Sequence, residues 1–169
     1  MVVDAVTITC QRRQAVDFST VYYDAHQRVL VPKSSQVRGL QDLGGKRVCA
    51  TAGTVPYREI QTYPSHPVPV GVQQAIDCLV ELQQGRISAV STDDAILLGF
   101  LKQDPYVKLV GPPIADAPYG IAISPAHPDF VRFVNGVLAQ MRADGQWQAL
   151  YGHWVGSPVP APPRAQYNG

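Results

Sequence analysis

Residues 85–100 read GRISAVSTDDAILLGF, and this stretch decides the fold class. Residues 87–91 are typical of a buried strand bounded by a glycine and a polar turn. Asp93 and Asp94 come next and precede an apolar helical pattern, and acids are favoured in the first turn of a helix because they face its free N–H groups. The stretch therefore predicts a strand that leads through a polar turn into a helix over residues 93–103.

The same alternation of strand and helix extends along the rest of the chain. The predicted strands are residues 2–9, 27–31, 46–51, 68–70, 87–91, 107–110 and 119–123, and the predicted helices are residues 55–63, 72–84, 93–103, 128–143 and 146–155. Alternating elements of this kind predict an α/β fold with a largely parallel sheet.

The composition excludes several classes of protein. The 169 residues carry 14 Lys and Arg against 13 Asp and Glu, so there is no positive surplus for binding nucleic acid or an anionic membrane surface. With 46% hydrophobic and 16% charged residues, the chain can bury a core and is not disordered by composition. No apolar run approaches the roughly 18 residues of a membrane helix, and no signal peptide opens the chain.

Common catalytic and cofactor motifs are missing. The sequence contains no GxGxxG, GxxxxGK[ST], GxSxG or HExxH, and its four histidines are scattered. No CxxC spacing exists, which excludes a zinc finger or ribbon. Cys10, Cys49 and Cys78 are therefore either buried small hydrophobic residues or a disulfide with one thiol left over. We predict a binding protein without catalytic residues, metal or cofactor.

Polar side chains gather at three places: residues 5–19, residues 52–56 and residues 91–94. The second and third follow predicted strands directly. Ligands of parallel α/β sheets bind outside the carboxyl ends of the strands, so these two segments are expected to lie at a ligand site.

Five segments of the chain, in order, read TITCQRRQAVDFSTVYY, LQDLGGKRVCATAGT, GRISAVSTDDAILLGF, PYGIAIS and VNGVLAQMRADGQWQALYGHW. In this order and spacing they resemble the periplasmic-binding-protein type 2 family, specifically the polar-amino-acid solute-binding proteins of ABC transporters. Within that family, the cysteines and the TDDAILLG stretch look most similar to glutamate-binding members from actinobacteria.

The resemblance implies a two-lobe α/β fold in which lobe 2 is intact and lobe 1 is truncated at the N-terminus. The implied parts are a lobe 1 remnant at residues 1–21 and 120–156, hinge strands at 22–26 and 117–119, lobe 2 at 27–116, and a proline-rich tail at 157–169. The family's first strand, first helix and aromatic ligand wall have no counterpart. We therefore expect helix 128–143 to expose part of its apolar stripe, which is formed by Phe130, Phe133, Val134, Val137, Leu138 and Met141.

The resemblance also assigns the two ends of an amino-acid ligand. Arg12 occupies the position of the family's carboxylate clamp, where a forked guanidinium donor matches a carboxylate, and the alternative is a solvated arginine. Asp93 matches the family's ammonium-binding acid, with Thr7 and the Ala5 carbonyl as further acceptors, and the alternative role for Asp93 is a helix N-cap.

Further ligand contacts are implied at the other polar turns. Thr54 offers a hydroxyl and an N–H group at a helix start, which favours an anion, and it can also be a plain N-cap. Some glutamine-binding relatives carry a lysine in place of Thr51, a glycine in place of Val55 and a histidine in place of Thr92. These differences argue against a direct copy of a glutamine site.

The glutamate-binding relatives carry cysteines at the strand and helix positions of Cys49 and Cys78. The resemblance therefore predicts a disulfide between these two residues and a free Cys10.

The function implied is capture of a polar amino acid for an ABC importer, with glutamate favoured and aspartate, glutamine and asparagine as rivals. The partners would be the amino acid and the permease, and the protein would be an extracytoplasmic monomer. It would reach a membrane only through a partner or a lipid anchor outside this chain. The alternatives are an amino-acid sensor for a membrane partner and a dehydratase-like enzyme of the same fold.

Overall fold

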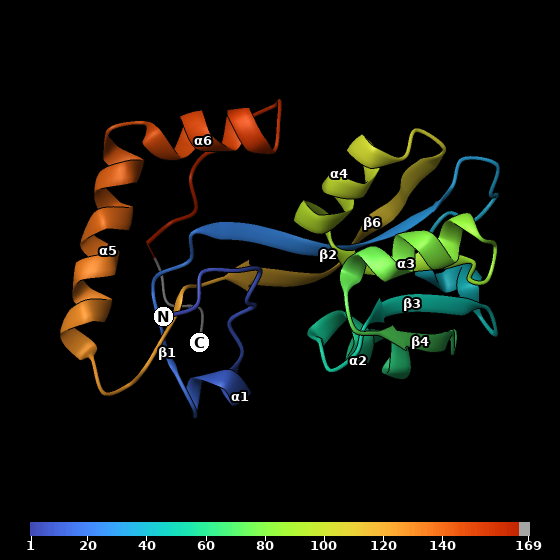
Figure 1. Ribbon diagram of the computed structural model, residues 1–169, viewed down its shortest axis with the longest axis horizontal. Helices are drawn as coiled ribbons and strands as arrows, with labels where there is room; N and C mark the ends of the chain where they lie inside the picture. The colour runs from blue at the N-terminus through green and yellow to red at the C-terminus, as the bar shows by residue number, and fades with distance from the viewer. Residues whose placement is uncertain (166–169) are drawn as a thin grey trace. The chain divides into compact units, whose positions relative to one another are not determined.

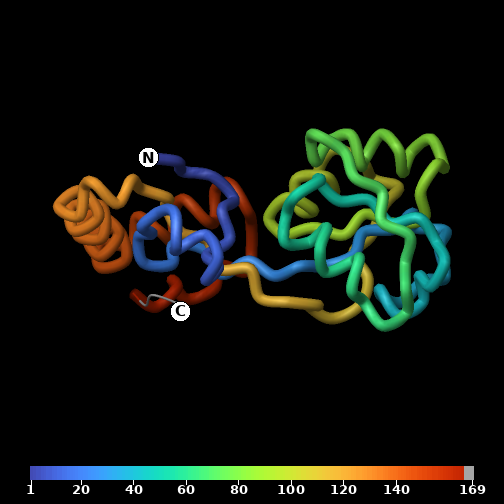
Figure 2. Tube along the Cα trace, turned by 90° about the horizontal axis from the view of Figure 1, so that it is seen from below, coloured from blue at the N-terminus to red at the C-terminus, as the bar shows by residue number. Residues whose placement is uncertain are grey.

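The computed structural model describes residues 1–165 of the chain, which divides into two compact units (Figure 1). Unit 2 is His26–Asp116, and unit 1 comprises Met1–Ala25 together with the chain from Ala117 onward. The chain passes into unit 2 within β2 (Tyr23–Pro32) and leaves it within β6 (Val107–Tyr119), and both segments can be followed in Figure 2.

Unit 2 is built on a five-stranded sheet of order β4-β3-β5-β2-β6. Strand β3 (Arg47–Thr51) pairs in parallel with β4 (Val68–Val72) and with β5 (Ala89–Asp93), whereas β2 runs antiparallel to β5. The prediction of a largely parallel sheet is therefore correct for β4, β3 and β5, whereas β2 is an antiparallel member of it. Hydrophobic periodicity carries no information on strand direction, which is set by the connection that brings β2 in from unit 1.

Four short helices connect these strands. They are the 3-10 helix η1 (Leu40–Leu43), α2 (Val55–Thr62), α3 (Ala75–Gln83) and α4 (Asp94–Gln103). Helix α3 begins three residues later than predicted because β4 continues to Val72. Strand β6 is longer than predicted and contains Pro112 and Pro113, which an edge strand tolerates because it needs fewer ladder hydrogen bonds.

The core of unit 2 lies on both faces of the sheet. Successive side chains of a strand point to opposite faces, and Val48 and Cys49 accordingly join different hydrophobic clusters. Cys49 packs with Leu30 and Val90 against α3 and α4, and the cluster of Val48 packs against α2 and η1. Nearly all of these residues are fully buried, so unit 2 has a closed core of its own.

The predicted disulfide is confirmed. Cys49 on β3 and Cys78 on α3 are bonded, with their Cα atoms 5.6 Å apart, and both side chains are buried. Cys10 is a free and exposed cysteine, also as predicted.

Unit 1 is poorer in strands. Its elements are α1 (Cys10–Arg13), the antiparallel pair β1 (Asp17–Phe18) and β7 (Ala122–Ile123), α5 (Pro128–Ala143) and α6 (Gln146–Trp154). The predicted strand over residues 2–9 is wrong, because only Val2 and Thr7 form isolated bridges there. Asp4 accepts a hydrogen bond from the following backbone N–H, a local turn that competes with strand pairing.

Contacts between residues far apart in the sequence hold unit 1 together. Val134 and Leu138 of α5 pack on Ile121 and Ile123. The Trp147 indole N–H donates to the Tyr22 carbonyl at 2.8 Å. The Tyr22 phenol is itself partly buried, and this burial, with Asp4 nearby, raises its pKa to about 12.

In the described part of the predicted tail, residues 157–165 form neither helix nor strand, and residues 166–169 lie outside the described part.

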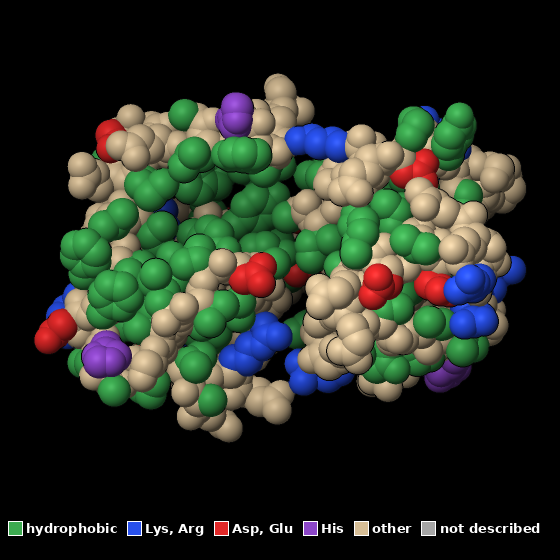
Figure 3. Space-filling model, viewed as in Figure 1, with side chains coloured by type: hydrophobic (Ala, Val, Ile, Leu, Met, Phe, Trp, Pro, Cys, Tyr) green, Lys and Arg blue, Asp and Glu red, His purple; other side chains and the backbone are tan. Residues whose placement is uncertain are grey.

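Much of the apolar surface of unit 1 is uncovered, and Figure 3 shows hydrophobic side chains gathered over this unit. The expected exposure of the α5 stripe is confirmed: Phe130, Phe133 and Val137 are 39%, 65% and 41% exposed. Leu150 and Trp154 of α6 are exposed as well. Contiguous apolar patches of this kind bind other apolar molecules.

A change of Phe133 to serine tests whether this exposed surface binds apolar molecules. We expect Phe133→Ser to reduce the fluorescence of the apolar dye anilinonaphthalene sulfonate by about half, because it removes an exposed ring that stacks on Phe130. Ile76→Ser, which removes an exposed apolar side chain from α3 of unit 2, is the control and should leave the signal nearly unchanged. Equal losses in the two variants would contradict a dye site on unit 1.

Candidate ligand-binding residues

Five of the predicted binding residues lie at one edge of the unit 2 sheet. Strands β3 and β5 are parallel neighbours, so their carboxyl ends meet at the same edge. Thr51 ends β3, and Thr92 and Asp93 end β5. Thr54 and Val55 begin α2, which follows β3 directly. The structure thus brings these five residues to the carboxyl ends of two neighbouring strands, where the sequence pattern places them.

Thr54 is held firmly at the start of α2. Its hydroxyl donates to the Thr51 carbonyl at 2.6 Å and accepts from the Tyr57 N–H at 3.4 Å, so it is the N-cap that the sequence predicts. Gly53, between them, has a φ of 77°, a left-handed conformation that glycine adopts without strain. Pro56 carries no N–H group and the Tyr57 N–H group already bonds to Thr54, so the Val55 N–H group is what the first turn of α2 offers to an anion.

Asp93 is a buried acid at the same edge. It is the last residue of β5 and the N-cap residue of α4, and it is only 4% exposed. Its side chain makes no capping hydrogen bond to the helix. A cap role therefore does not account for this carboxylate, whereas Asp94 behaves as an ordinary first-turn acid by accepting from the Ala95 N–H.

Arg12 lies in unit 1, on the short helix α1. Thr9 caps this helix by accepting from the Arg12 N–H at 3.2 Å. The Arg12 guanidinium is half-buried and donates through Nη1 to the Thr7 carbonyl at 2.7 Å. One bond fixes the direction of the side chain, and the remaining guanidinium N–H groups can serve a carboxylate.

The other two predicted residues of unit 1 have different surroundings. Thr7 is buried and forms a bridge to Tyr119, and its carbonyl positions Arg12. Ala5 is exposed. Thr7 thus supports the proposed carboxylate clamp, a contribution that the sequence alone did not indicate.

Sequence reasoning missed Gln27, which lies under the edge of unit 2. It stands opposite Asp93 in the β2–β5 register and is 1% exposed. Its amide donates to the Ser91 hydroxyl at 2.9 Å, and its Oε1 atom is buried without a hydrogen-bond partner among the described residues. The signal that could have identified this buried polar residue is its place in the alternation of Ala25, Gln27, Val29 and Val31, which points all four side chains to one face of the sheet.

A pocket elsewhere in unit 2 is separate from this edge. It has a volume of about 540 Å³ and is lined by Pro32, Leu82, Gln103, Tyr106 and Val107 among others. Leu82 and Gln103 lie at the C-terminal ends of α3 and α4, Pro32 ends β2 and Val107 begins β6, so the pocket is at the opposite end of the strands from Asp93. Its size does not make it the ligand site, because it contains none of the polar residues described above.

Residues 1–165 contain no group of three or more His, Cys, Asp and Glu residues arranged to hold a metal ion. They also contain no helix with the length and apolar character needed to cross a membrane.

Comparison with known proteins identifies the family. The model for the bacterial extracellular solute-binding proteins, family 3, matches residues 1–157, and the chain belongs to this family. An ABC transporter glutamine-binding protein of Bacillus subtilis is 32% identical over 155 residues, which cover 91% of this chain and 57% of that protein. An ABC transporter arginine-binding protein of Escherichia coli is 28% identical, covering 90% of this chain and 65% of that protein.

Solved structures show the same fold. An ancestral arginine-binding protein bound to glutamine is 32% identical with a TM-score of 0.84, covering 90% of this chain and 69% of that one. The GluR0 ligand-binding core from Nostoc punctiforme, in complex with L-glutamate, is 27% identical with a TM-score of 0.82, covering 90% and 71%. The fold is thus that of the type 2 periplasmic binding proteins. The family consists of solute-binding proteins, and the chain is not an enzyme.

The chain spans between about half and two thirds of the length of the curated relatives it matches. Its relatives bind different amino acids according to their names, which include glutamine, arginine, cystine and glutamate or aspartate.

Proposed function

We propose that this chain is the ligand-binding part of an extracytoplasmic protein that captures a polar amino acid for an ABC importer. Arg12 binds the α-carboxylate and Asp93 binds the α-ammonium group. The observation that carries the proposal is the buried Asp93 carboxylate, which ends a strand at the ligand edge of the sheet without capping its helix. The names of the relatives, all amino-acid-binding proteins, support it.

Glutamate is the favoured ligand. The start of α2 offers two donors that suit a second carboxylate, the Val55 N–H group and the Thr51 hydroxyl, because the Thr54 hydroxyl already donates to the Thr51 carbonyl. Aspartate, glutamine and asparagine are the rivals. Delivery to a permease and action as a monomer belong to the same proposal, and membership of the solute-binding family supports the first of them.

Isothermal titration calorimetry of the whole chain with each of the twenty amino acids tests the proposal. We expect saturable binding, tightest for glutamate. Tighter binding of arginine or another cationic amino acid would contradict the glutamate preference alone. Absence of binding for all twenty would contradict the proposed function.

Asp93→Asn separates a ligand role from a structural one. Asparagine keeps the size of the side chain but loses the charge, so we expect glutamate to bind about 10- to 150-fold more weakly, the range of about 1.5–3 kcal/mol for a hydrogen bond to a charged group. The control is Asp77→Asn, which removes the charge of an acid at the start of a different helix, α3. It should change affinity less than twofold, and a similar loss in both variants would contradict the assignment.

A further inference from the structure

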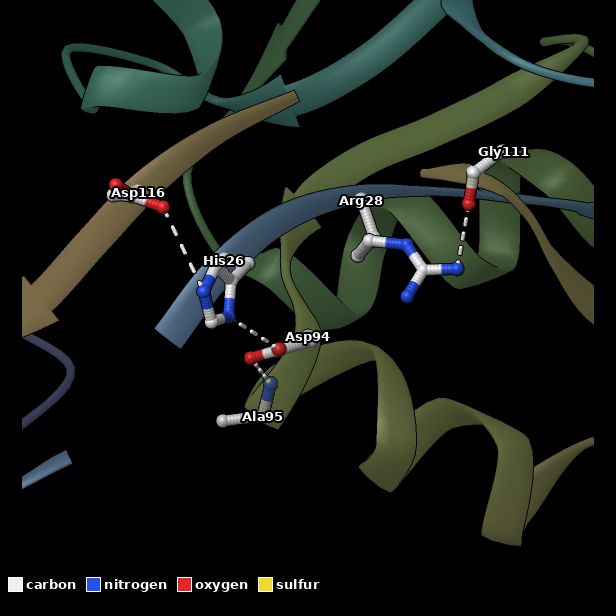
Figure 4. Close-up of polar contacts among 6 residues, drawn as sticks. All are labelled: His26, Arg28, Asp94, Ala95, Gly111 and Asp116. Carbon is white, nitrogen blue, oxygen red and sulfur yellow. Dashed lines mark hydrogen bonds and ion pairs between the residues drawn. The ribbon is translucent and has the colours of Figure 1, made fainter. Parts of the chain in front are cut away.

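His26 stands where the chain enters unit 2. It is the first residue of this unit, on β2, and Asp116, on β6, is the last. Figure 4 shows the His26 ring lying between the carboxylates of Asp116 and Asp94. Asp94 is the first residue of α4 and directly follows Asp93, so the ring joins β6 and the start of α4 to β2.

The two contacts use different nitrogens of the ring. Nδ1 lies 3.5 Å from Oδ2 of Asp94, and Nε2 lies 3.6 Å from Oδ1 of Asp116. A neutral imidazole carries one N–H group, and its other nitrogen presents a lone pair, whereas an imidazolium carries two N–H groups. Only the protonated ring therefore offers a donor to both carboxylates. Histidine is the side chain that ordinarily changes charge between pH 5 and 8.

The contact with Asp94 reaches the proposed ligand site. One oxygen of this carboxylate accepts from the Ala95 N–H at 2.8 Å, and the other faces His26. The carboxylate thus connects the first turn of α4 to β2. Because Asp93 is the N-cap residue of α4, a change in the contact between Asp94 and His26 acts on the backbone that carries Asp93.

Other charges near the ring do not replace these contacts. On β2, Asp24 is exposed, and Arg28 donates to the Gly111 carbonyl on β6 at 2.7 Å (Figure 4). At the end of β5, Asp93 is the other nearby acid. The Asp94 side chain is 23% exposed and that of Asp116 is 88% exposed, so water screens the contact with Asp116 more strongly.

We propose that His26 is a positioning residue for ligand binding, whose protonated ring holds the start of α4 against β2 and β6 and makes the affinity for the ligand depend on pH. The proposal rests on the proposed function of Asp93. Protonation of His26 raises the affinity for an anionic ligand such as glutamate in two ways. It fixes the helix start beside Asp93, and it reduces the negative charge of this acidic group.

The test is calorimetric titration of the whole chain with glutamate at pH 5.5, 6.5, 7.5 and 8.5. We expect the dissociation constant to rise at least fivefold from pH 5.5 to 8.5. His26→Gln should remove this dependence and bind as weakly at every pH as the wild type does at pH 8.5. Asp116→Asn should reduce the dependence only slightly, whereas the control His127→Gln, in unit 1, should keep it. An unchanged pH dependence in His26→Gln overturns the proposal.

A second measurement needs no ligand. Long-range ¹H–¹⁵N NMR spectra of the histidine rings show which nitrogens carry protons, and backbone spectra report the amides of Asp94 and Ala95. We expect these amide signals to move in step with the His26 ring between pH 5.5 and 8.5, and to stay in place in His26→Gln. If the ring changes its protonation and these amides do not move, His26 does not position α4. If the amide signals do move while no amino acid binds, the proposed function is contradicted, but the contact between His26 and the start of α4 is supported.

Discussion

Replacing Arg12 by alanine is expected to weaken glutamate binding by roughly 30- to 5,000-fold, which corresponds to about 2–5 kcal/mol. The physical reason is that a carboxylate removed from water needs a paired cation, and a guanidinium supplies two parallel N–H donors. Its bond to the Thr7 carbonyl at 2.7 Å orients this donor before the ligand arrives, so little side-chain entropy is lost on binding. Calorimetry with glutamate measures the effect.

Two variants make this result specific. Arg13→Ala removes the same charge from the neighbouring position on α1 and should change affinity less than threefold. Arg12→Lys keeps the charge but loses the fork, so an intermediate affinity is expected. A dissociation constant for Arg12→Ala within a factor of two of the wild type, in a chain whose circular dichroism spectrum is unchanged, would exclude Arg12 as the clamp.

The second large effect concerns stability. We expect the double change of Cys49 and Cys78 to alanine to lower the free energy of unfolding of unit 2 by about 3–4 kcal/mol, because the bond closes a loop between residues 29 apart in the sequence and so restricts the unfolded chain. For a unit of this size, that loss corresponds to a fall in Tm of roughly 10–30 °C. Urea unfolding followed by circular dichroism measures it.

Cys10→Ser is the matched control, since this thiol is exposed and free. It should unfold within about 0.5 kcal/mol of the wild type, as surface substitutions usually do. Alkylation followed by intact-mass spectrometry should label one thiol before reduction and three after. A double variant as stable as the control would show that the bond adds nothing to unit 2. A stabilising disulfide supports the proposed extracytoplasmic location, where such bonds persist.

Interactions between residues close in the sequence were sufficient to predict much of the fold and part of the site. The N-cap of α2 depends on Thr54 and on the residues next to it, so its position could be predicted from the sequence without knowledge of the sheet. The same holds for the strand that ends at Asp93, where the apolar run and the acids that follow are neighbours in the chain. Parallel pairing of β3 and β5 then brought both turns to one edge.

Contacts between distant parts of the chain decided the rest. Strand β2 turned out antiparallel to β5, and residues 2–9 formed no strand, because direction and pairing depend on partners that hydrophobic periodicity does not specify. Gln27 and Ser91, 64 residues apart, bond under the edge of the sheet. His26 contacts acids on α4 and β6, and scattered histidines carry no spacing signal, so only the tertiary structure could place its ring between two carboxylates.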